Sequence, residues 1–191
     1  KDEQIQRIDE EFAKLKEIIG DAIYGEDEDT LQIVIGKYLK NKGMTLSAAE
    51  SCTGGKIASL LTSVAGASQY FWGSVTSYDN SVKENVLGVP HEIIAQHGAV
   101  SQECVEAMAK GVNRVMNTDF AVATSGIAGP GGGSPEKPVG TAWLAVAYHD
   151  KTTGKDEVIS KKVAFNSSRE VNIDRFASNA LNLLRLYLEK H

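Results

Sequence analysis

The feature that most constrains the fold is an alternation of short apolar runs with amphipathic helical segments from residue 43 onward. Strand-like runs at residues 44–49, 73–78 and 120–125 are separated by stretches with helical periodicity. Two further runs, 140–149 and 156–165, flank a Lys-Thr-Thr-Gly turn, which indicates an antiparallel hairpin. We therefore expect an α/β fold, a three-layer α/β/α sandwich with a mixed, mostly parallel sheet of about five strands.

Helices are expected between these strands and at both ends of the chain. Apolar residues at three- and four-residue spacing, together with capping residues, indicate where they begin and end. The predicted helices cover residues 5–19, 31–41, 54–62, 91–97 and 101–116, with a short helix from Ser81 and a last one from Ser167 or Ser168 to the C-terminus.

The N-terminal segment differs from the rest of the chain. Its helix carries apolar residues at 5, 8, 12, 15, 18 and 19 and is followed by an acidic run at residues 25–30, which is typical of a solvated linker. The sequence therefore predicts a helical extension over residues 1–28 and one domain over residues 29–191. The apolar face of the helix is expected to pack on its own domain or on a partner subunit.

Composition excludes several classes of protein. The formal charge of −5 argues against a nucleic-acid-binding surface, and the chain has no apolar run long enough for a membrane span and no signal peptide. Two cysteines are too few for a disulfide scaffold, and the four histidines lack metal-ligand spacing. We expect a cytoplasmic protein with no metal and no cofactor, which binds neither nucleic acid nor membrane.

The segment around Ser51 is the first candidate for chemistry. The strand at 44–49 runs into Glu-Ser-Cys-Thr-Gly-Gly and then into a helix, so main-chain N–H groups at this turn are available to an anion or an oxyanion. Gly54 and Gly55 let a ligand approach the backbone. Ser51 or Thr53 could instead be only a helix cap. Cys52 is an alternative nucleophile, or else a small buried residue.

Lys83 and Tyr78 follow the strand at 73–78. Ser81 and Glu84 form a Ser-x-x-Glu capping box, which predicts that the helix starts at Ser81 and that Lys83 lies in its first turn. The positive end of the helix dipole there would lower the pKa of the lysine, as suits a group that must accept a proton. Lys83 could equally be exposed on the surface. Tyr78 could orient the pair or relay a proton.

A glycine-rich loop spans residues 125–140 and follows a buried strand. Loops of this length are often binding loops, so Ser125, Gly126, Gly129 and Gly131 are candidates for contact with a phosphate or ribose, and disorder is the alternative. On the last predicted helix, Arg169 and Arg175 are also candidates for a phosphate contact, with a surface role as the alternative. No histidine lies near Ser51 in sequence, so a Ser–Lys pair needs fewer assumptions than a Ser-His-Asp triad.

Four motifs in this order resemble the CinA C-terminal family: AAESCTGG at 48–55, SYDNSVK at 77–83, QHGAVS at 96–101, and SGIAGP at 125–130 with PVGT at 138–141. Standalone bacterial members of this family are similar to nicotinamide-nucleotide amidases. The resemblance implies a serine nucleophile, a lysine base and a tyrosine, which correspond to Ser51, Lys83 and Tyr78. It also implies a mixed-sheet sandwich, no metal, and a homo-oligomer.

The resemblance also concerns what precedes the domain. The segment at residues 25–31 is similar to the link that follows a molybdopterin-binding-like domain in full-length CinA proteins, so we expect such a domain as a possible N-terminal partner. The mechanism we expect is deamidation of nicotinamide mononucleotide by Ser51 and Lys83, with substrate contacts from residues 52–55, the glycine-rich loop and Arg169. The rival hypotheses are a non-catalytic interaction or nucleotide-sensing module, and an amidase for another small amide.

Overall fold

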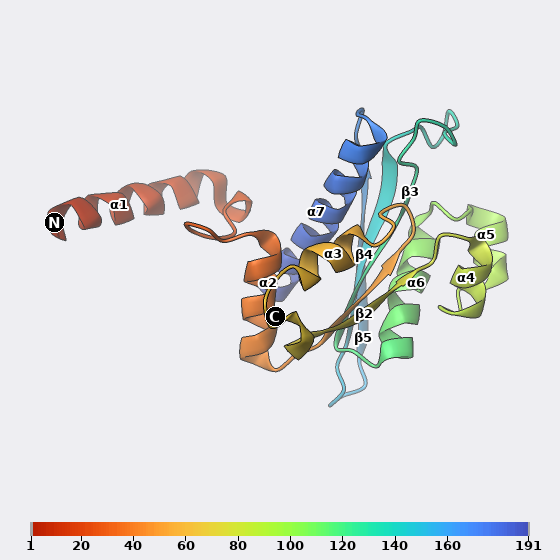
Figure 1. Ribbon diagram of the computed structural model, residues 1–191, viewed down its shortest axis with the longest axis horizontal. Coiled ribbons are helices and arrows are strands. Elements are labelled where there is room, and N and C mark those ends of the chain that lie inside the picture. Colours follow the sequence, from red (N-terminus) through yellow and green to blue (C-terminus); the bar gives the residue numbers. More distant parts are fainter. Residues whose placement is uncertain (1, 191) are drawn as a thin grey trace.

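A computed structural model describes the backbone of residues 2–190 and the side chains of residues 4–190 (Figure 1). The elements follow one another in the order α1 (Asp2–Ile19), η1 (Gly20–Ala22), α2 (Leu31–Lys42), β1 (Leu46–Glu50), α3 (Lys56–Thr62), η2 (Ala67–Gln69), β2 (Phe71–Thr76), α4 (Asn80–Asn85), α5 (His91–His97), α6 (Gln102–Met116), β3 (Phe120–Gly126), β4 (Thr141–His149), β5 (Asp156–Ala164) and α7 (Arg169–Leu188).

The five strands form one mixed sheet in the order β2-β1-β3-β4-β5. β1 lies parallel to both β2 and β3, whereas β4 is antiparallel to β3 and to β5. Only β4 therefore runs against the other strands. The predicted α/β class, the mostly parallel sheet and the hairpin at its edge are confirmed.

Helices cover both faces of the sheet, and the strands send alternate side chains to each (Figure 1). On β3, Phe120 and Val122 pack toward α2, α3 and α7. Ala121 and Ala123 face the other way, toward α6. The small alanine side chains leave room for α6. Gly111 of this helix lies against the segment that follows α4, since a Cβ added there would lie 2.1 Å from the main-chain oxygen of Leu87.

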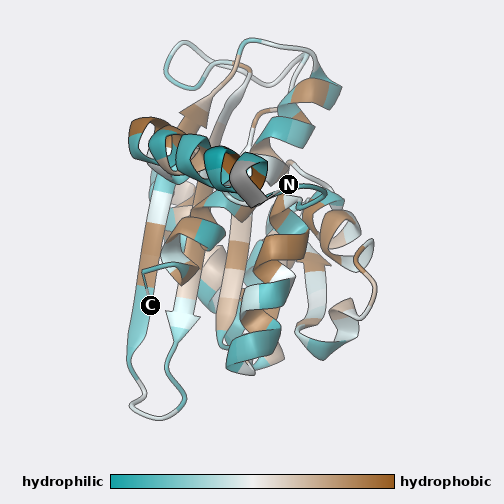
Figure 2. Cartoon of the chain, turned by 90° about the vertical axis from the view of Figure 1, so that its left-hand side faces the viewer, coloured by the Kyte–Doolittle hydropathy of each residue, from teal (hydrophilic) through white to brown (hydrophobic). Residues whose placement is uncertain are grey.

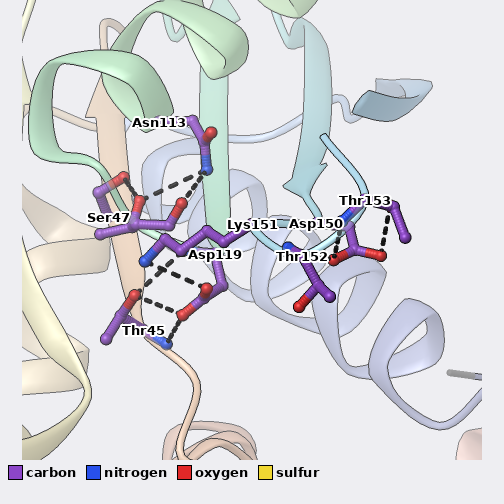
Figure 3. A network of polar contacts seen from close by, with 9 residues as sticks. Thr45, Ser47, Asn113, Asp119, Asp150, Lys151, Thr152 and Thr153 are labelled. Carbon is purple, nitrogen blue, oxygen red and sulfur yellow. Dashed lines mark hydrogen bonds and ion pairs between the residues drawn. The ribbon is translucent and has the colours of Figure 1, made fainter. Parts of the chain in front are cut away.

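A polar network fastens the end of the sheet where β1 and β3 begin (Figure 3). Asp119 precedes β3, and its Oδ2 accepts hydrogen bonds from the main-chain N and the Oγ1 of Thr45, both at 2.7 Å. Its Oδ1 lies 3.1 Å from the Nζ of Lys151 in the β4–β5 turn. The network joins the start of β1 to the tip of the hairpin, so the opposite end, where β1, β2 and β3 terminate, is left for the loops.

The predicted N-terminal helix is present as α1, which projects away from the sheet (Figure 1). Its apolar residues are largely exposed, with Ile8 at 68% and Ile18 at 79%. Figure 2 shows apolar and polar segments alternating along α1, as expected for an amphipathic helix with one uncovered face. No helix in the described part of the chain is long and apolar enough to cross a membrane.

Several predicted boundaries are shifted by a few residues. β1 extends to Glu50, and β2 ends at Thr76 rather than at Tyr78. α3 begins at Lys56 rather than at residue 54, because Gly54 and Gly55 have φ values of +59° and +105°, outside the helical region. The last helix ends at Leu188, and His191 lies outside the described residues.

Candidate active site

More than half of the predicted site residues line a cavity of ≈ 200 Å³ at the carboxyl ends of the parallel strands β1, β2 and β3. Open α/β sheets commonly bind ligands at this end. The cavity is lined by Ser51, Cys52, Tyr78, Asn80, Lys83, Ala99, Val100, Ser125, Gly126, Ala128 and Arg169. A larger cavity of ≈ 380 Å³ lies near the β4–β5 hairpin, but none of the predicted site residues lines it.

Ser51 is the first residue of the turn that joins β1 to α3. Its main-chain N donates a hydrogen bond of 3.0 Å to the oxygen of Thr124 on β3, and its main-chain oxygen accepts one of 3.2 Å from the N of Gly54. The positive φ values of Gly54 and Gly55 let the chain reverse within a few residues. The turn therefore fixes the backbone of Ser51 at the edge of the cavity.

Glu50, which was not predicted as a site residue, binds the main-chain N–H groups at the start of α3. Its side chain is fully buried. Its carboxylate accepts hydrogen bonds from the main-chain N of Gly55 (3.1 Å), Ile57 (2.9 Å) and Ala58 (2.9 Å). The N–H groups of Gly54 and Gly55, expected to face an oxyanion, are therefore already used inside the protein.

Two main-chain donors remain beside Ser51. Among the described residues, the N–H groups of Cys52 and Thr53 form no hydrogen bond to another residue. Adjacent N–H groups next to a nucleophile are the usual composition of an oxyanion hole. The Thr53 side chain itself is buried, and its Oγ1 lies 2.7 Å from the Oγ1 of Thr124, so this hydroxyl does not line the cavity.

Cys52 lines the cavity with a buried side chain. Burial raises the pKa of its thiol to about 12, although a hydrogen bond with Thr124 partly opposes this shift. Only the thiolate is strongly nucleophilic, so a thiol with this pKa is protonated and inert at neutral pH. The environment of Cys52 thus disfavours the alternative in which it acts in place of Ser51.

Lys83 lies on α4, but the helix starts differently from the prediction. Asp79 is the N-cap and accepts a hydrogen bond of 2.9 Å from the N of Ser81, so the predicted capping box beginning at Ser81 is wrong. Asp79 has the extended backbone that a cap requires, with φ −82° and ψ 152°. Lys83 is consequently the fourth residue of the helix and lies beyond its first turn.

The Lys83 side chain is only 1% exposed. Its Nζ donates hydrogen bonds to the main-chain oxygens of Ser77 (2.7 Å) and Tyr78 (3.3 Å). Burial lowers the pKa of this amine from its ordinary value, because the charged form loses its hydration. The pKa falls in the direction that we predicted, but desolvation causes the shift rather than the helix dipole.

Tyr78 and Arg169 form the mouth of the cavity. The Tyr78 side chain is 64% exposed, and its hydroxyl oxygen accepts a hydrogen bond of 3.3 Å from the Nη2 of Arg169. The Nη1 of Arg169 donates one of 2.7 Å to the main-chain oxygen of Gly129. Arg175 lies elsewhere, with its guanidinium 5.4 Å from the centre of the Phe165 ring.

The glycine-rich loop contributes only part of its predicted contacts. Ser125 and Gly126 line the cavity, and the Oγ of Ser125 donates a hydrogen bond of 2.6 Å to the oxygen of Ala99. Gly129 reaches the site only through its bond with Arg169, and Gly131 is exposed and does not line the cavity.

Sequence reasoning missed Asn80 and the apolar wall made by Ala99, Val100 and Ala128. Asn80 stands between Tyr78 and Lys83 in the sequence, and this position could have indicated that it belongs to the site. Within the described residues, no group of three or more His, Cys, Asp or Glu side chains is arranged to hold a metal ion.

The sequence resembles known proteins over nearly its whole length. The sequence profile of the CinA C-terminal domain matches residues 28–188. A CinA-like protein from Cytophaga hutchinsonii is 44% identical over 189 residues, which cover 98% of this chain and 44% of that relative. A CinA-like protein from Desulfotalea psychrophila is 46% identical over 181 residues, covering 95% of this chain and 42% of that relative. The chain thus spans less than half the length of these relatives.

Solved structures agree with the sequence comparisons. The competence/damage inducible protein CihA from Agrobacterium tumefaciens has a TM-score of 0.78 and 36% identity, covering 87% of this chain and 98% of its own. A CinA superfamily protein from Klebsiella pneumoniae has a TM-score of 0.77 and 32% identity, covering 84% of this chain and 97% of its own. This chain belongs to the CinA C-terminal domain family.

Proposed function

We propose that this domain hydrolyses the amide of nicotinamide mononucleotide to nicotinate mononucleotide and ammonia, with Ser51 as nucleophile and Lys83 as base. The observation that carries the proposal is a buried lysine of lowered pKa lining the same cavity as an accessible serine. A neutral amine has two N–H bonds and one lone pair. The oxygens of Ser77 and Tyr78 use the two N–H bonds, which leaves the lone pair for the proton of Ser51.

The reaction then proceeds in two halves. Lys83 takes the hydroxyl proton while the Oγ of Ser51 attacks the carboxamide carbon, and the N–H groups of Cys52 and Thr53 stabilise the oxyanion. The carbon–nitrogen bond breaks, and Lys83 returns the proton so that ammonia leaves. Lys83 next takes a proton from water, the hydroxide cleaves the acyl–serine ester, and Ser51 recovers its proton. The products are ammonia and the carboxylate.

The small volume of the cavity supports an arrangement in which only part of the substrate enters it. Pockets for drug-sized ligands are usually about 300–1,000 Å³, whereas this one is ≈ 200 Å³. The nicotinamide ring would fill it, and the ribose phosphate would lie at the mouth near Arg169. In that arrangement the Tyr78 hydroxyl accepts a hydrogen bond from the Arg169 guanidinium, and the main-chain oxygen of Tyr78 accepts one from Lys83.

The proposed setting follows from the same chemistry. We place this activity in pyridine nucleotide recycling in the cytoplasm, where the buried free thiols of Cys52 and Cys104 would stay reduced.

We also propose that the chain works as a homo-oligomer. Analytical ultracentrifugation tests this second point, and a monomer at micromolar concentration would contradict it.

The decisive experiment incubates the purified protein with nicotinamide mononucleotide and follows ammonia between about pH 6 and pH 10. Release by the wild type and none by Ser51→Ala would support the proposal. Binding of the nucleotide without release at any pH would favour a non-catalytic sensing module instead. A panel of other small carboxamides, run alongside, separates an amidase of different specificity from an inactive protein.

A further inference from the structure

The geometry points to Glu50 as the positioning residue of this site: it holds the Ser51 turn with its carboxylate and the segment that anchors Lys83 with its main-chain oxygen. This inference rests on the proposed roles of Ser51 and Lys83. Glu50 touches neither substrate nor reacting atoms, since it does not line the cavity.

The first argument is how the buried carboxylate is satisfied. Among the described residues, Glu50 has no ion-pair partner, and burying a carboxylate without compensation is strongly unfavourable. Its compensation is the bonds to Gly55, Ile57 and Ala58, with the Oγ of Ser74 at 3.5 Å. These N–H groups belong to the start of a helix, where donors lack intrahelical partners and the dipole favours negative charge.

The second argument is the place of Glu50 in the chain. An ordinary helix cap occupies the residue just before the helix, whereas Glu50 is five residues before the cap Gly55 and is the last residue of β1. Its side chain therefore spans the Ser51 turn and ties the strand to the helix on the other side. The turn between them, with its two left-handed glycines, is held at both ends.

The third argument is the main-chain oxygen of Glu50. It accepts a hydrogen bond of 2.8 Å from the N of Ser77, and the oxygen of Ser77 accepts one of 2.7 Å from the Nζ of Lys83. Only these two hydrogen bonds lie between the backbone beside Ser51 and the Lys83 amine. A displacement of Glu50 would therefore alter the separation of nucleophile and base.

Occupation of the α3 N-terminus has a consequence for substrate binding. An anion at this helix start would have to displace the Glu50 carboxylate, which carries the same charge. The substrate phosphate is thus excluded from α3. Of the two cationic side chains that line the cavity, Lys83 is the proposed neutral base, so Arg169 at the mouth would receive the phosphate.

The test compares Glu50→Gln with the wild type. Both carboxylate oxygens accept main-chain N–H groups, so either orientation of the glutamine amide places its NH₂ against a donor. We expect kcat to fall about 10- to 100-fold, as for other small displacements of catalytic groups. KM and the pH midpoint of kcat/KM should stay unchanged, because Glu50 does not line the cavity and is not among the charged groups that act on Lys83.

The Glu50→Gln experiment includes a matched control variant and a readout that does not depend on the substrate. Thr62→Ala removes a hydrogen bond to Ala58 at the far, exposed end of α3 and should leave kcat at the wild-type value. Labelling of Ser51 by a small fluorophosphonate, followed by mass spectrometry, should be at least about tenfold slower in Glu50→Gln. Slower labelling in a protein whose wild type releases no ammonia would refute the proposed substrate but retain the role of Glu50.

Three outcomes would overturn the role of Glu50. The first is a folded Glu50→Gln that is labelled and turns over at the wild-type rate. The second concerns Glu50→Asp, which keeps the charge on a shorter side chain and serves if the glutamine variant does not fold; wild-type kcat there would have the same meaning. The third is failure of both variants to fold, because Glu50 would then be a determinant of the whole fold.

Discussion

The Nζ of Lys83 lies 2.7 Å from the main-chain oxygen of Ser77, the residue that directly follows β2. The buried amine is thus held by the backbone rather than by a carboxylate, and no ion pair involving Lys83 occurs among the described residues. A carboxylate at this place would have kept the lysine protonated. The oxygen of Ser77 fixes the amine and leaves burial free to lower its pKa.

This relationship predicts the pH dependence of the reaction. The base must be neutral, so kcat/KM should rise with pH through the lowered pKa of Lys83 and level off below the ordinary lysine value of about 10.4. Lys83→Arg, which stays charged, should be inactive throughout this range. A profile that falls with rising pH would contradict the assignment of Lys83 as base.

The lowered pKa of Lys83 also affects the stability of the fold. Between the folded and the unfolded pKa of Lys83, the unfolded chain binds the proton and the folded chain does not. The free energy of unfolding should therefore rise with pH in this window. Urea titrations at several pH values should show this rise in the wild type but not in Lys83→Met. Equal pH slopes for the two proteins would show that the amine titrates normally.

Ser51→Ala should lower ammonia release by at least about 1,000-fold, because the nucleophile is lost. Cys52→Ala should keep turnover within about tenfold, since the neighbouring thiol is protonated at neutral pH. Steady-state assays of both variants, with circular dichroism to verify folding, make the comparison. The reverse result would assign the chemistry to the thiol.

Arg169→Met should raise KM for nicotinamide mononucleotide about 10- to 100-fold, the usual worth of a hydrogen bond to a charged group. The corresponding riboside, which has no phosphate, should be affected much less. Arg175→Met is the matched control on the same helix, because Arg175 packs over Phe165 and does not line the cavity. Equal losses for nucleotide and riboside would show that Arg169 does not bind the phosphate.

Gly140→Ala should destabilise the fold by roughly 2–4 kcal/mol, since the new Cβ adds both strain and overpacking. Gly140 has φ +89°, and a Cβ there would lie 1.6 Å from the oxygen of Phe165. Gly131→Ala in the same loop should change stability by less than about 0.5 kcal/mol, because its Cβ would have no neighbour within 4 Å. Urea denaturation of both variants measures the difference.

Local patterns were sufficient for most of the fold. The alternation of apolar runs and helices predicted the sheet, and the Lys-Thr-Thr-Gly turn predicted the hairpin of β4 and β5. Both signals depend on neighbours along the chain. The start of α4 was predicted less well, because Asp79 and Ser81 can each act as a cap and the extended backbone of Asp79 decided between them.

The site required information that only the tertiary structure holds. The burial of Lys83 has no periodic signal in a helix of six residues, and its pKa shift follows from that burial. Glu50 reads in the sequence as the last polar residue before a turn. Its contact with α3 depends on the φ values of Gly54 and Gly55, which no residue pattern specifies.

The separation between the two ends of the sheet offers a place for a reporter group. The β4–β5 turn is exposed around Thr152 and lies at the end fastened by Asp119 and Lys151 (Figure 3), whereas the cavity is at the carboxyl ends of β1, β2 and β3. Exposed turns of this kind tolerate insertions well. A fluorophore or affinity tag inserted there would allow ligand binding to be followed on a surface with the loops around the cavity left untouched.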